Sequence, residues 1–230
     1  MLPMSRIPAF VPGHVEPGGP SLVWRLAEVE IRKASVSAED NNAYLFTDGV
    51  SGSRLLIDAA DDADRLQGFI AEPEPAGDLV GICTTHQHWD HHRALLALAE
   101  HTRAPTFAGA ADAPALPVAV DHHLEHGDVI NVGAHRIDVI GLRGHTPGSV
   151  ALAWQDAHSG VVHIFSGDSL FPGGVGKTNS AEEFASLIDD VEKRIFDVFG
   201  DDTVIYPGHG DNTTLGAERP HLDQWRERGW

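Results

Sequence analysis

A chain of 230 residues, 42% of them hydrophobic, is long enough to bury the core of one domain. Its formal net charge of -18 at pH 7 repels phosphate backbones, and no Lys/Arg cluster offsets it, so we expect no nucleic-acid partner. The only cysteine, Cys83, excludes a disulfide within the chain and suits a reducing, cytoplasmic compartment.

The chain begins with turn-forming residues. Residues 1–20 contain five Pro and three Gly, and they lack the basic start and apolar core of a signal peptide. They predict a flexible N-terminal arm that crosses the body or a neighbouring subunit, so a homo-oligomer is one expectation. The arm has no apolar run that could span a membrane, and we expect no membrane partner. Residues 21–230 predict a single domain.

The first half of this domain alternates strand and helix patterns. The polar, glycine-containing residues 48–52 predict a hairpin between two of its strands. The predicted strands cover residues 22–33, 43–46, 53–58 and 79–83, and the predicted helices cover residues 61–71 and 92–100.

Seven residues fill the turn between the last of these strands and the last of these helices: Thr85-His86-Gln87-His88-Trp89-Asp90-His91. His86 and His88 are two residues apart and can point the same way from an extended segment, whereas Asp90 and His91 are adjacent and point elsewhere. This arrangement suits two neighbouring metal ions better than one. Because the chain has 15 His, a histidine-rich surface turn is the alternative.

Three later turns argue against chance, because each follows an apolar run and offers one potential ligand beside a glycine. They are Gly144-His145, Gly167-Asp168 and Gly208-His209. We therefore predict a metal site built from distant parts of the chain. His122, His123 and His126 have no such partners and lie among acidic residues, which predicts a solvated loop within residues 105–127.

The second half predicts antiparallel strands followed by a long helix. Ser180-Ala181-Glu182-Glu183 has the form of a capping box, and apolar residues then repeat with helical spacing from Phe184 to Val198, until Gly200 ends the helix. The predicted strands cover residues 129–132, 136–142, 150–154, 161–165 and 203–206.

The potential ligands, in their order along the chain, resemble those of the metallo-β-lactamase-fold hydrolases, and within them the glyoxalase II-like (hydroxyacylglutathione hydrolase-like) branch. The resemblance covers about residues 40 to 215. It implies an α+β fold, a four-layer αβ/βα sandwich, with a metallo-hydrolase domain over residues 21–230. An aspartate at position 168 makes antibiotic hydrolysis the less expected activity, since the β-lactamases have cysteine or no bridging aspartate there.

The resemblance also implies the ligand sets. One ion would be held by His86, His88 and His145, the other by Asp90, His91 and His209, with Asp168 bridging. Asp90 and Asp168 are the implied catalytic carboxylates, beside a metal-bridging hydroxide that attacks the substrate carbonyl. Two divalent ions are expected, zinc first, with iron or manganese as alternatives.

Two further residues keep two interpretations each. Lys177 resembles the basic residue that anchors the carboxylate of the substrate's thiol carrier, and a surface lysine is the alternative. Asp58 resembles a carboxylate that holds a metal-ligating histidine, and a turn or helix-capping residue is the alternative.

We therefore predict a dinuclear-metal hydrolase that cleaves an acyl thioester or an ester. Only 21 residues follow His209, too few for the C-terminal helical domain with which glyoxalase II grips glutathione, so the thiol carrier stays open. A lactonase and a persulfide dioxygenase with a single iron are the alternative enzymes, and a non-catalytic binding module is the third class.

Overall fold

The computed structural model describes residues 13–229, and their first half forms a seven-stranded sheet. Its strands are β1 (Leu22–Arg25), β2 (Val29–Ser35), β3 (Asn42–Asp48), β4 (Arg54–Ile57), β5 (Leu79–Thr84), β6 (Thr106–Gly109) and β7 (His122–Leu124). They lie in chain order, antiparallel from β1 to β4 and parallel from β4 to β7.

The second half forms a six-stranded sheet in the order β15-β14-β11-β10-β9-β8 and a small hairpin. The sheet contains β8 (Val129–Val132), β9 (His135–Gly141), β10 (Val150–Gln155), β11 (Val162–Gly167), β14 (Val204–Pro207) and β15 (Thr213–Thr214). The hairpin consists of β12 (Leu170–Phe171) and β13 (Gly174–Val175). In the six-stranded sheet, neighbouring strands are antiparallel, except that β11 and β14 are parallel.

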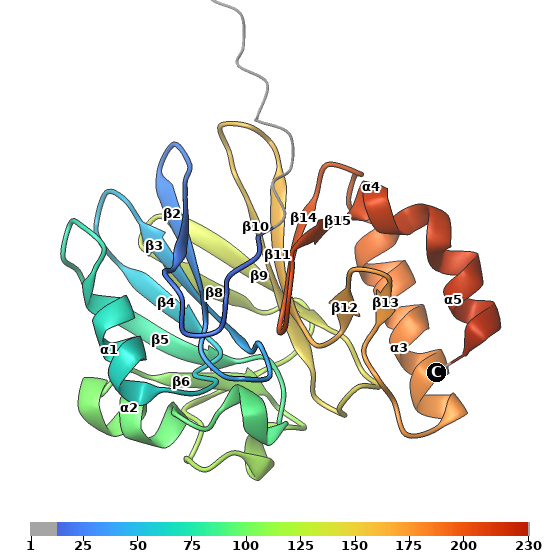
Figure 1. Ribbon diagram of the computed structural model, residues 1–230, viewed down its shortest axis with the longest axis horizontal. Coiled ribbons are helices and arrows are strands. Elements are labelled where there is room, and N and C mark those ends of the chain that lie inside the picture. Colours follow the sequence, from blue (N-terminus) through green and yellow to red (C-terminus); the bar gives the residue numbers. More distant parts are fainter. Residues whose placement is uncertain (1–12, 230) are drawn as a thin grey trace, which may run out of the picture.

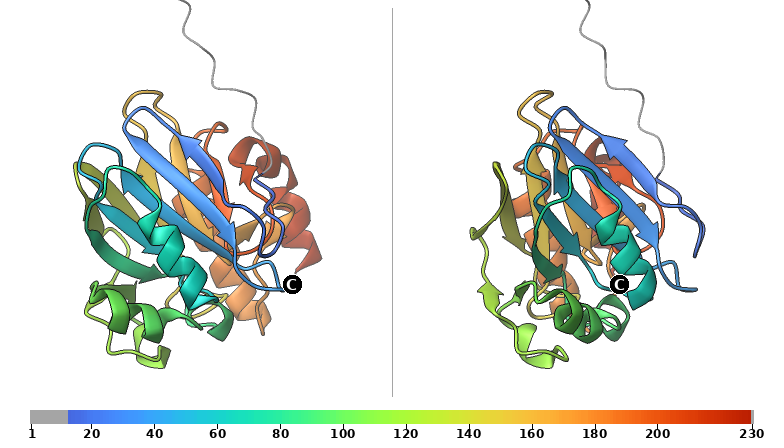
Figure 2. Two further views of the ribbon diagram at one scale, coloured as in Figure 1. Left: turned by 60° about the vertical axis from the view of Figure 1, so that its left-hand side comes forward. Right: turned by 90° about the vertical axis from the view of Figure 1, so that its left-hand side faces the viewer.

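Helices cover the outer faces of both sheets (Figure 1). They are α1 (Ala63–Ala71), α2 (Leu95–Thr102), α3 (Ala181–Val191), α4 (Leu215–Glu218) and α5 (Leu222–Arg228). Figure 2 shows α1 and α2 in front of the first sheet, with the second sheet behind it and α3 and α5 beyond. The predicted four-layer αβ/βα sandwich is confirmed.

Three hydrophobic cores separate these four layers. Leu45 faces the core under α1 and α2, while its neighbour Phe46 faces the core between the two sheets. In the second sheet, Phe165 faces that same central core, and Ile164 faces the core under α3 and α5. Because successive side chains of a strand point to opposite faces, these strands are buried on both sides.

The structure corrects three of the predicted elements. The predicted strand over 22–33 is a hairpin, since Leu26 donates its backbone N–H to the carbonyl of Val29 and turns the chain between β1 and β2. The predicted loop over 105–127 contains β6 and β7, and β7 carries His122 and His123 as exposed residues. Val198 is 63% exposed and lies outside the core face of the last predicted helix, whose α3 part is followed by a π-helical turn.

Residues 1–12 of the predicted arm lie outside the described residues. Residues 13–20 lie against the body: Lys33 donates to the carbonyl of Gly13, and Gly18 donates to the carbonyl of Ser35. Among the described residues, Val15 is buried. The division of the chain at residue 20 stays a prediction. No helix within residues 13–229 is long and apolar enough to cross a membrane.

Candidate metal centre

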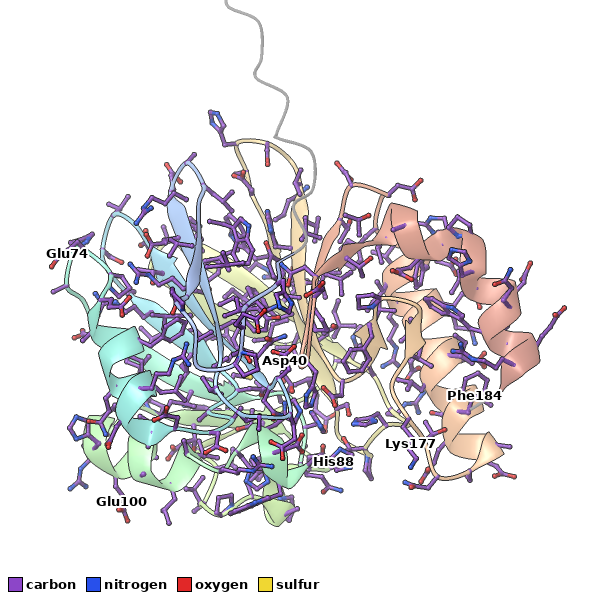
Figure 3. All side chains as sticks on the ribbon, in the orientation of Figure 1. Asp40, Glu74, His88, Glu100, Lys177 and Phe184 are labelled. Atoms are coloured by element: carbon purple, nitrogen blue, oxygen red, sulfur yellow. The ribbon has the colours of Figure 1, made fainter. Side chains whose placement is uncertain are left out.

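The predicted ligands leave the carboxyl ends of four strands at one edge of the sandwich. His86 to His91 follow β5, His145 follows β9, Asp168 follows β11 and His209 follows β14. His88 and Lys177, both labelled in Figure 3, mark this edge at the lower side of the view. His145 contacts both residues: its ring centroid lies 4.5 Å from that of His88, and its Nδ1 is 2.7 Å from the Lys177 carbonyl oxygen. Strand ends of a rigid sheet position such groups well.

Two sets of side chains gather at this edge, together with Asp168. The ligand atoms of His86, His88 and His145 lie within 4.8 Å of one another, and so do those of Asp90, His91 and His209. Within the second set, Asp90 Oδ2 is 3.2 Å from His209 Nε2 and 3.6 Å from His91 Nε2. Atoms about 2 Å from one tetrahedral ion lie roughly 3.3 Å apart, so this spacing suits a shared metal ion.

Asp168 lies between the two sets. Its Oδ2 is 3.7 Å from His145 Nε2 and 3.6 Å from His209 Nε2, and its Oδ1 is 3.3 Å from His91 Nε2. It also lies 4.0 Å from His86 Nε2. One carboxylate therefore reaches ligands of both sets, which is what a bridging position requires.

The histidine rings are oriented by acceptors on their far side. Nδ1 of His91 is 3.0 Å from an Asp58 carboxylate oxygen, Nδ1 of His145 is 2.7 Å from the Lys177 carbonyl, and Nδ1 of His209 is 2.8 Å from the Glu39 carbonyl. An acceptor at Nδ1 favours the proton there, so each Nε2 faces the centre and can offer its lone pair to a metal ion.

Several atoms at the centre have no hydrogen-bond partner among the described residues although they are buried. These are Nε2 of His86, Nε2 of His145 and Oδ1 of Asp168. Buried polar atoms are nearly always paired, so buried ligand atoms that converge without a partner are what a cation-binding site requires. The residues present therefore fit divalent metal ions.

The electrostatics of the site agree with this. Burial and the neighbouring histidines hold the pKa of His86 well below its usual value. Burial also works to lower the pKa of His91, but the carboxylates of Asp168 and Asp58 outweigh it and raise this pKa to about 10. The hydrogen bond with His209 lowers the pKa of Asp90 despite partial burial. The carboxylates therefore attract positive charge to the centre, which a proton on His91 supplies in the metal-free chain and a metal ion would supply in its place.

Asp58 lies behind the ligands and does not cap a helix. Its carboxylate accepts from Thr85 N at 2.7 Å and Thr85 Oγ1 at 2.8 Å, and it contacts His91. The N-cap of α1 is Asp62, which accepts from Arg65 N. Asp58 thus ties the start of the ligand turn to one of its histidines.

The backbone carbonyl of Lys177 lies behind the ring of His145, and the Lys177 side chain lies outside the centre. Its exposed side chain lines a hollow of about 260 Å³ beside the hairpin of β12 and β13, together with Phe171 and Arg228. The ring of Phe171 lies 6.5 Å from that of His209, which places this hollow next to the ligands.

Two supporting residues were not predicted from the sequence. Asn41, fully buried, donates through Nδ2 to Asp90 Oδ2 at 2.9 Å and also lies 3.2 Å from His209 Nε2. Asp112, also fully buried, accepts hydrogen bonds from two of the ligand loops. Both contacts join residues that are far apart in the sequence, and neither residue stands in a recognisable motif.

Comparisons with known proteins agree with this geometry. The family model of the Metallo-beta-lactamase superfamily matches residues 36–209, most of the chain. The hydroxyacylglutathione hydrolase of Jannaschia sp. (strain CCS1) is 38% identical over 139 residues, which are 60% of this chain and 51% of that relative. The chain spans about half the length of the first curated relatives that it matches.

Solved structures agree as well. ETHE1 from Myxococcus xanthus is 27% identical with a TM-score of 0.71, over 86% of this chain and 84% of that one. TTHA1623, solved in a di-iron-bound form, is 29% identical with a TM-score of 0.63, over 81% of this chain and 96% of that one. The predicted glyoxalase II-like resemblance is confirmed, and the chain belongs to the metallo-beta-lactamase superfamily.

Proposed function

We propose that this protein is a dinuclear-metal hydrolase that cleaves an acyl thioester or an ester. The observation that carries the proposal is the position of Asp168, which is within 4.0 Å of Nε2 atoms from both sets of ligands. The similarity to hydroxyacylglutathione hydrolases and to a di-iron protein supports it.

In this proposal His86, His88 and His145 hold one ion, and Asp90, His91 and His209 hold the other, with Asp168 between them. When bound, such ions polarise a carbonyl and bring the pKa of a coordinated water toward ~7. The metals would be divalent, with zinc, iron and manganese all compatible with His/carboxylate ligation.

The chain's own groups then set the charge of the site. Asp90 and Asp168 offset two of the four positive charges of two divalent ions, so a loaded centre keeps a net positive charge that favours an anionic transition state. Asn41 holds the Asp90 carboxylate in place by its 2.9 Å hydrogen bond. Asp58 keeps His91 oriented, since its carboxylate is 3.0 Å from His91 Nδ1.

The substrate's carrier would lie along the hairpin of β12 and β13. Lys177 and Arg228 are two cations in one hollow of a chain with only 16 Lys and Arg and a net charge of -18. A carrier with a carboxylate, such as a glutathione-like thiol, would complement them. Phe171 lines the same hollow and offers an apolar contact.

The test is a hydrolysis screen of hydroxyacyl thioesters, simple esters and lactones on metal-analysed protein. We expect about two metal ions per chain and thioester or ester hydrolysis. Asp168→Ala should lower that activity more than about 100-fold, because even groups behind the ligands are worth 10–100-fold. Asp138→Ala, an exposed carboxylate on β9, is the matched control. Full activity of Asp168→Ala would overturn the proposal.

A persulfide dioxygenase with a single iron is the second candidate, and the likeness to ETHE1 fits it. It predicts one iron per chain and oxygen uptake with a persulfide. The same metal analysis, combined with an oxygen electrode, separates the two enzymes. One iron, oxygen uptake and no hydrolysis would replace the hydrolase proposal with the dioxygenase.

A further inference from the structure

Asp112 lies at the point where ligand loops from the two sheets meet. It follows β6 in the first sheet, directly before a short 3-10 turn (Ala113–Ala115), and it is 0% exposed. It is not one of the metal-ligating candidates, and its carboxylate faces away from solvent. A fully buried carboxylate requires several donors to compensate for its lost hydration.

Those donors come from two loops that carry metal ligands. Asp112 Oδ2 accepts from the backbone N–H of Gln87 at 2.9 Å and from Thr146 Oγ1 at 2.5 Å, and Oδ1 accepts from the backbone N–H of Gly148 at 2.7 Å. Gln87 stands between His86 and His88, and Thr146 directly follows His145. One carboxylate thus joins the loop after β5 to the loop before β10.

The backbone segments around these hydrogen bonds are closely packed. A Cβ on Gly148 would lie 2.4 Å from Asp112 N, and a Cβ on Gly109 would lie 1.9 Å from the carbonyl oxygen of Gly148. Glycine at both positions lets the loop before β10 lie against the end of β6 and the backbone of Asp112. The hydroxyl of Thr146 donates to Asp112, and Ser149 Oγ lies 2.5 Å from it, so the donor is itself held in place.

We propose that Asp112 is a positioning residue that sets the separation of His86 and His88 from His145, and thereby the metal affinity of that three-histidine set. The proposal rests on the proposed dinuclear centre. The other set has its own supports, since Asp58 contacts His91 and Asn41 contacts Asp90 and His209. Loss of the Asp112 carboxylate therefore affects one site and spares the other.

Asp112→Asn is the informative change because it keeps the size of the side chain. An amide retains one oxygen, so its NH₂ group must face either the donors on Oδ2 or the N–H of Gly148. One of the two loops then meets a donor where it had an acceptor. The loop with His88 and the loop with His145 are no longer held at one distance.

The experiment is titration of the metal-free full chain with Zn²⁺ by calorimetry, and with Co²⁺ by absorption spectroscopy. For wild type we expect two ions. For Asp112→Asn we expect one ion bound as tightly as before and one bound about 10–100-fold more weakly, the range found for residues that support metal ligands. Thr146→Val removes one of the three bonds and should give a smaller loss at the same site.

Asp48→Asn is the matched control. Asp48 is also buried, and it accepts from Ser51 Oγ and Val50 N in its own turn and from Ala134 N in the turn between β8 and β9. These turns lie away from the ligand loops. We expect it to lower the free energy of unfolding of the metal-free protein and to leave both metal affinities unchanged.

The outcomes distinguish the two proposals. A wild-type chain that binds fewer than two ions contradicts the dinuclear centre. Two ions in wild type with unchanged affinities in Asp112→Asn contradict the role of Asp112 alone. Equal weakening of both sites, or the same weakening in Asp48→Asn, would mean that Asp112 only stabilises the fold. If Asp112→Asn does not fold, Thr146→Val decides, and unchanged affinity there overturns the proposal.

Discussion

At the scale of single residues, Asp58 supports the metal centre, whereas helix capping falls to a different aspartate. It contacts His91 and Thr85, while Asp62, four residues later, caps α1. We expect Asp58→Asn to lower metal affinity and activity about 10–100-fold, because the amide cannot accept from all of these donors.

Asp62→Ala is the control for that variant. It should cost about 1 kcal/mol of folding free energy through the lost N-cap and leave activity unchanged. Metal titration, activity and denaturant unfolding of both variants make the comparison. If Asp58→Asn lost only stability, as Asp62→Ala should, the supporting role would be wrong.

Lys177 gives a prediction about substrate binding. Lys177→Ala should raise KM about fivefold for a thioester with a carboxylate-bearing carrier and leave kcat unchanged, since an exposed ion pair is worth at most about 1 kcal/mol. The KM of a neutral ester should not change, and added salt should shrink the difference. Lys193→Ala, an exposed lysine beyond α3, is the control. Equal effects on charged and neutral substrates would argue against an anionic carrier.

At the scale of elements, Gly144 connects α3 to the ligand His145. Its φ is +139°, and a Cβ there would lie 2.3 Å from the carbonyl oxygen of Glu183 and 2.6 Å from Leu187 Cβ, both in α3. Gly144→Ala should therefore displace the helix or the loop. We expect it to cost about 1–3 kcal/mol of overpacking beyond the backbone strain.

Gly160→Ala is the control that introduces backbone strain at a positive φ without a new side-chain contact. Gly160 also has a positive φ, +79°, but nothing lies within 4 Å of its Cβ position. The difference in unfolding free energy between the two variants, measured by denaturant titration, gives the cost of the contact with α3 together with the extra strain of φ +139° over +79°. A difference near zero would mean that α3 can move away from the new Cβ without a cost in stability.

The elements also explain which predictions succeeded. The strand before His86 and the helix after Ser180 were predictable because burial and helical packing impose local periodicity on the sequence. The turn between β1 and β2 was missed because residues 26–28 contain no Gly, Pro or Asn. β7 was missed because only Leu124 of its three residues is buried, and its partner β6 is 13 or more positions away.

The supports of the site escaped prediction for a related reason. Asn41 and Asp112 act on residues 25 to 168 positions away in the sequence, so nothing in their neighbourhood marks them. The ligands themselves were predictable because they follow strands in a recurring order, and the three later ones, His145, Asp168 and His209, each stand directly after a glycine.

At the scale of the whole molecule, the fold places two halves of the chain around one central core. Each half supplies a sheet covered by helices, and the centre lies where both sheets end. Local periodicity cannot predict how two sheets pair, and the sandwich followed from the resemblance in the ligand motifs. Titratable side chains that are buried between the sheets then make the stability of the molecule depend on pH.

His163 contributes to that dependence from outside the metal centre. It is 5% exposed between Trp154 and Tyr206, and burial lowers its pKa to about 4 against the opposing charge of Asp156. Between pH 6.5 and about 4 the unfolded chain binds a proton at this position that the folded chain does not. Stability must therefore fall as pH falls through this window, by up to about 3 kcal/mol at about 1.4 kcal/mol per pH unit.

His163→Gln removes the titration and can keep the hydrogen bond to Tyr206, which is 2.9 Å long in the native chain. Histidines at the metal centre titrate too, so both proteins must be compared at equal metal content by denaturant unfolding from pH 7 to pH 4. The variant should lose less stability across this range than wild type, whereas His158→Gln, an exposed residue of the β10–β11 turn, should follow the wild-type curve. Parallel curves for wild type and His163→Gln would show that the folded protein accepts the proton at position 163 without cost.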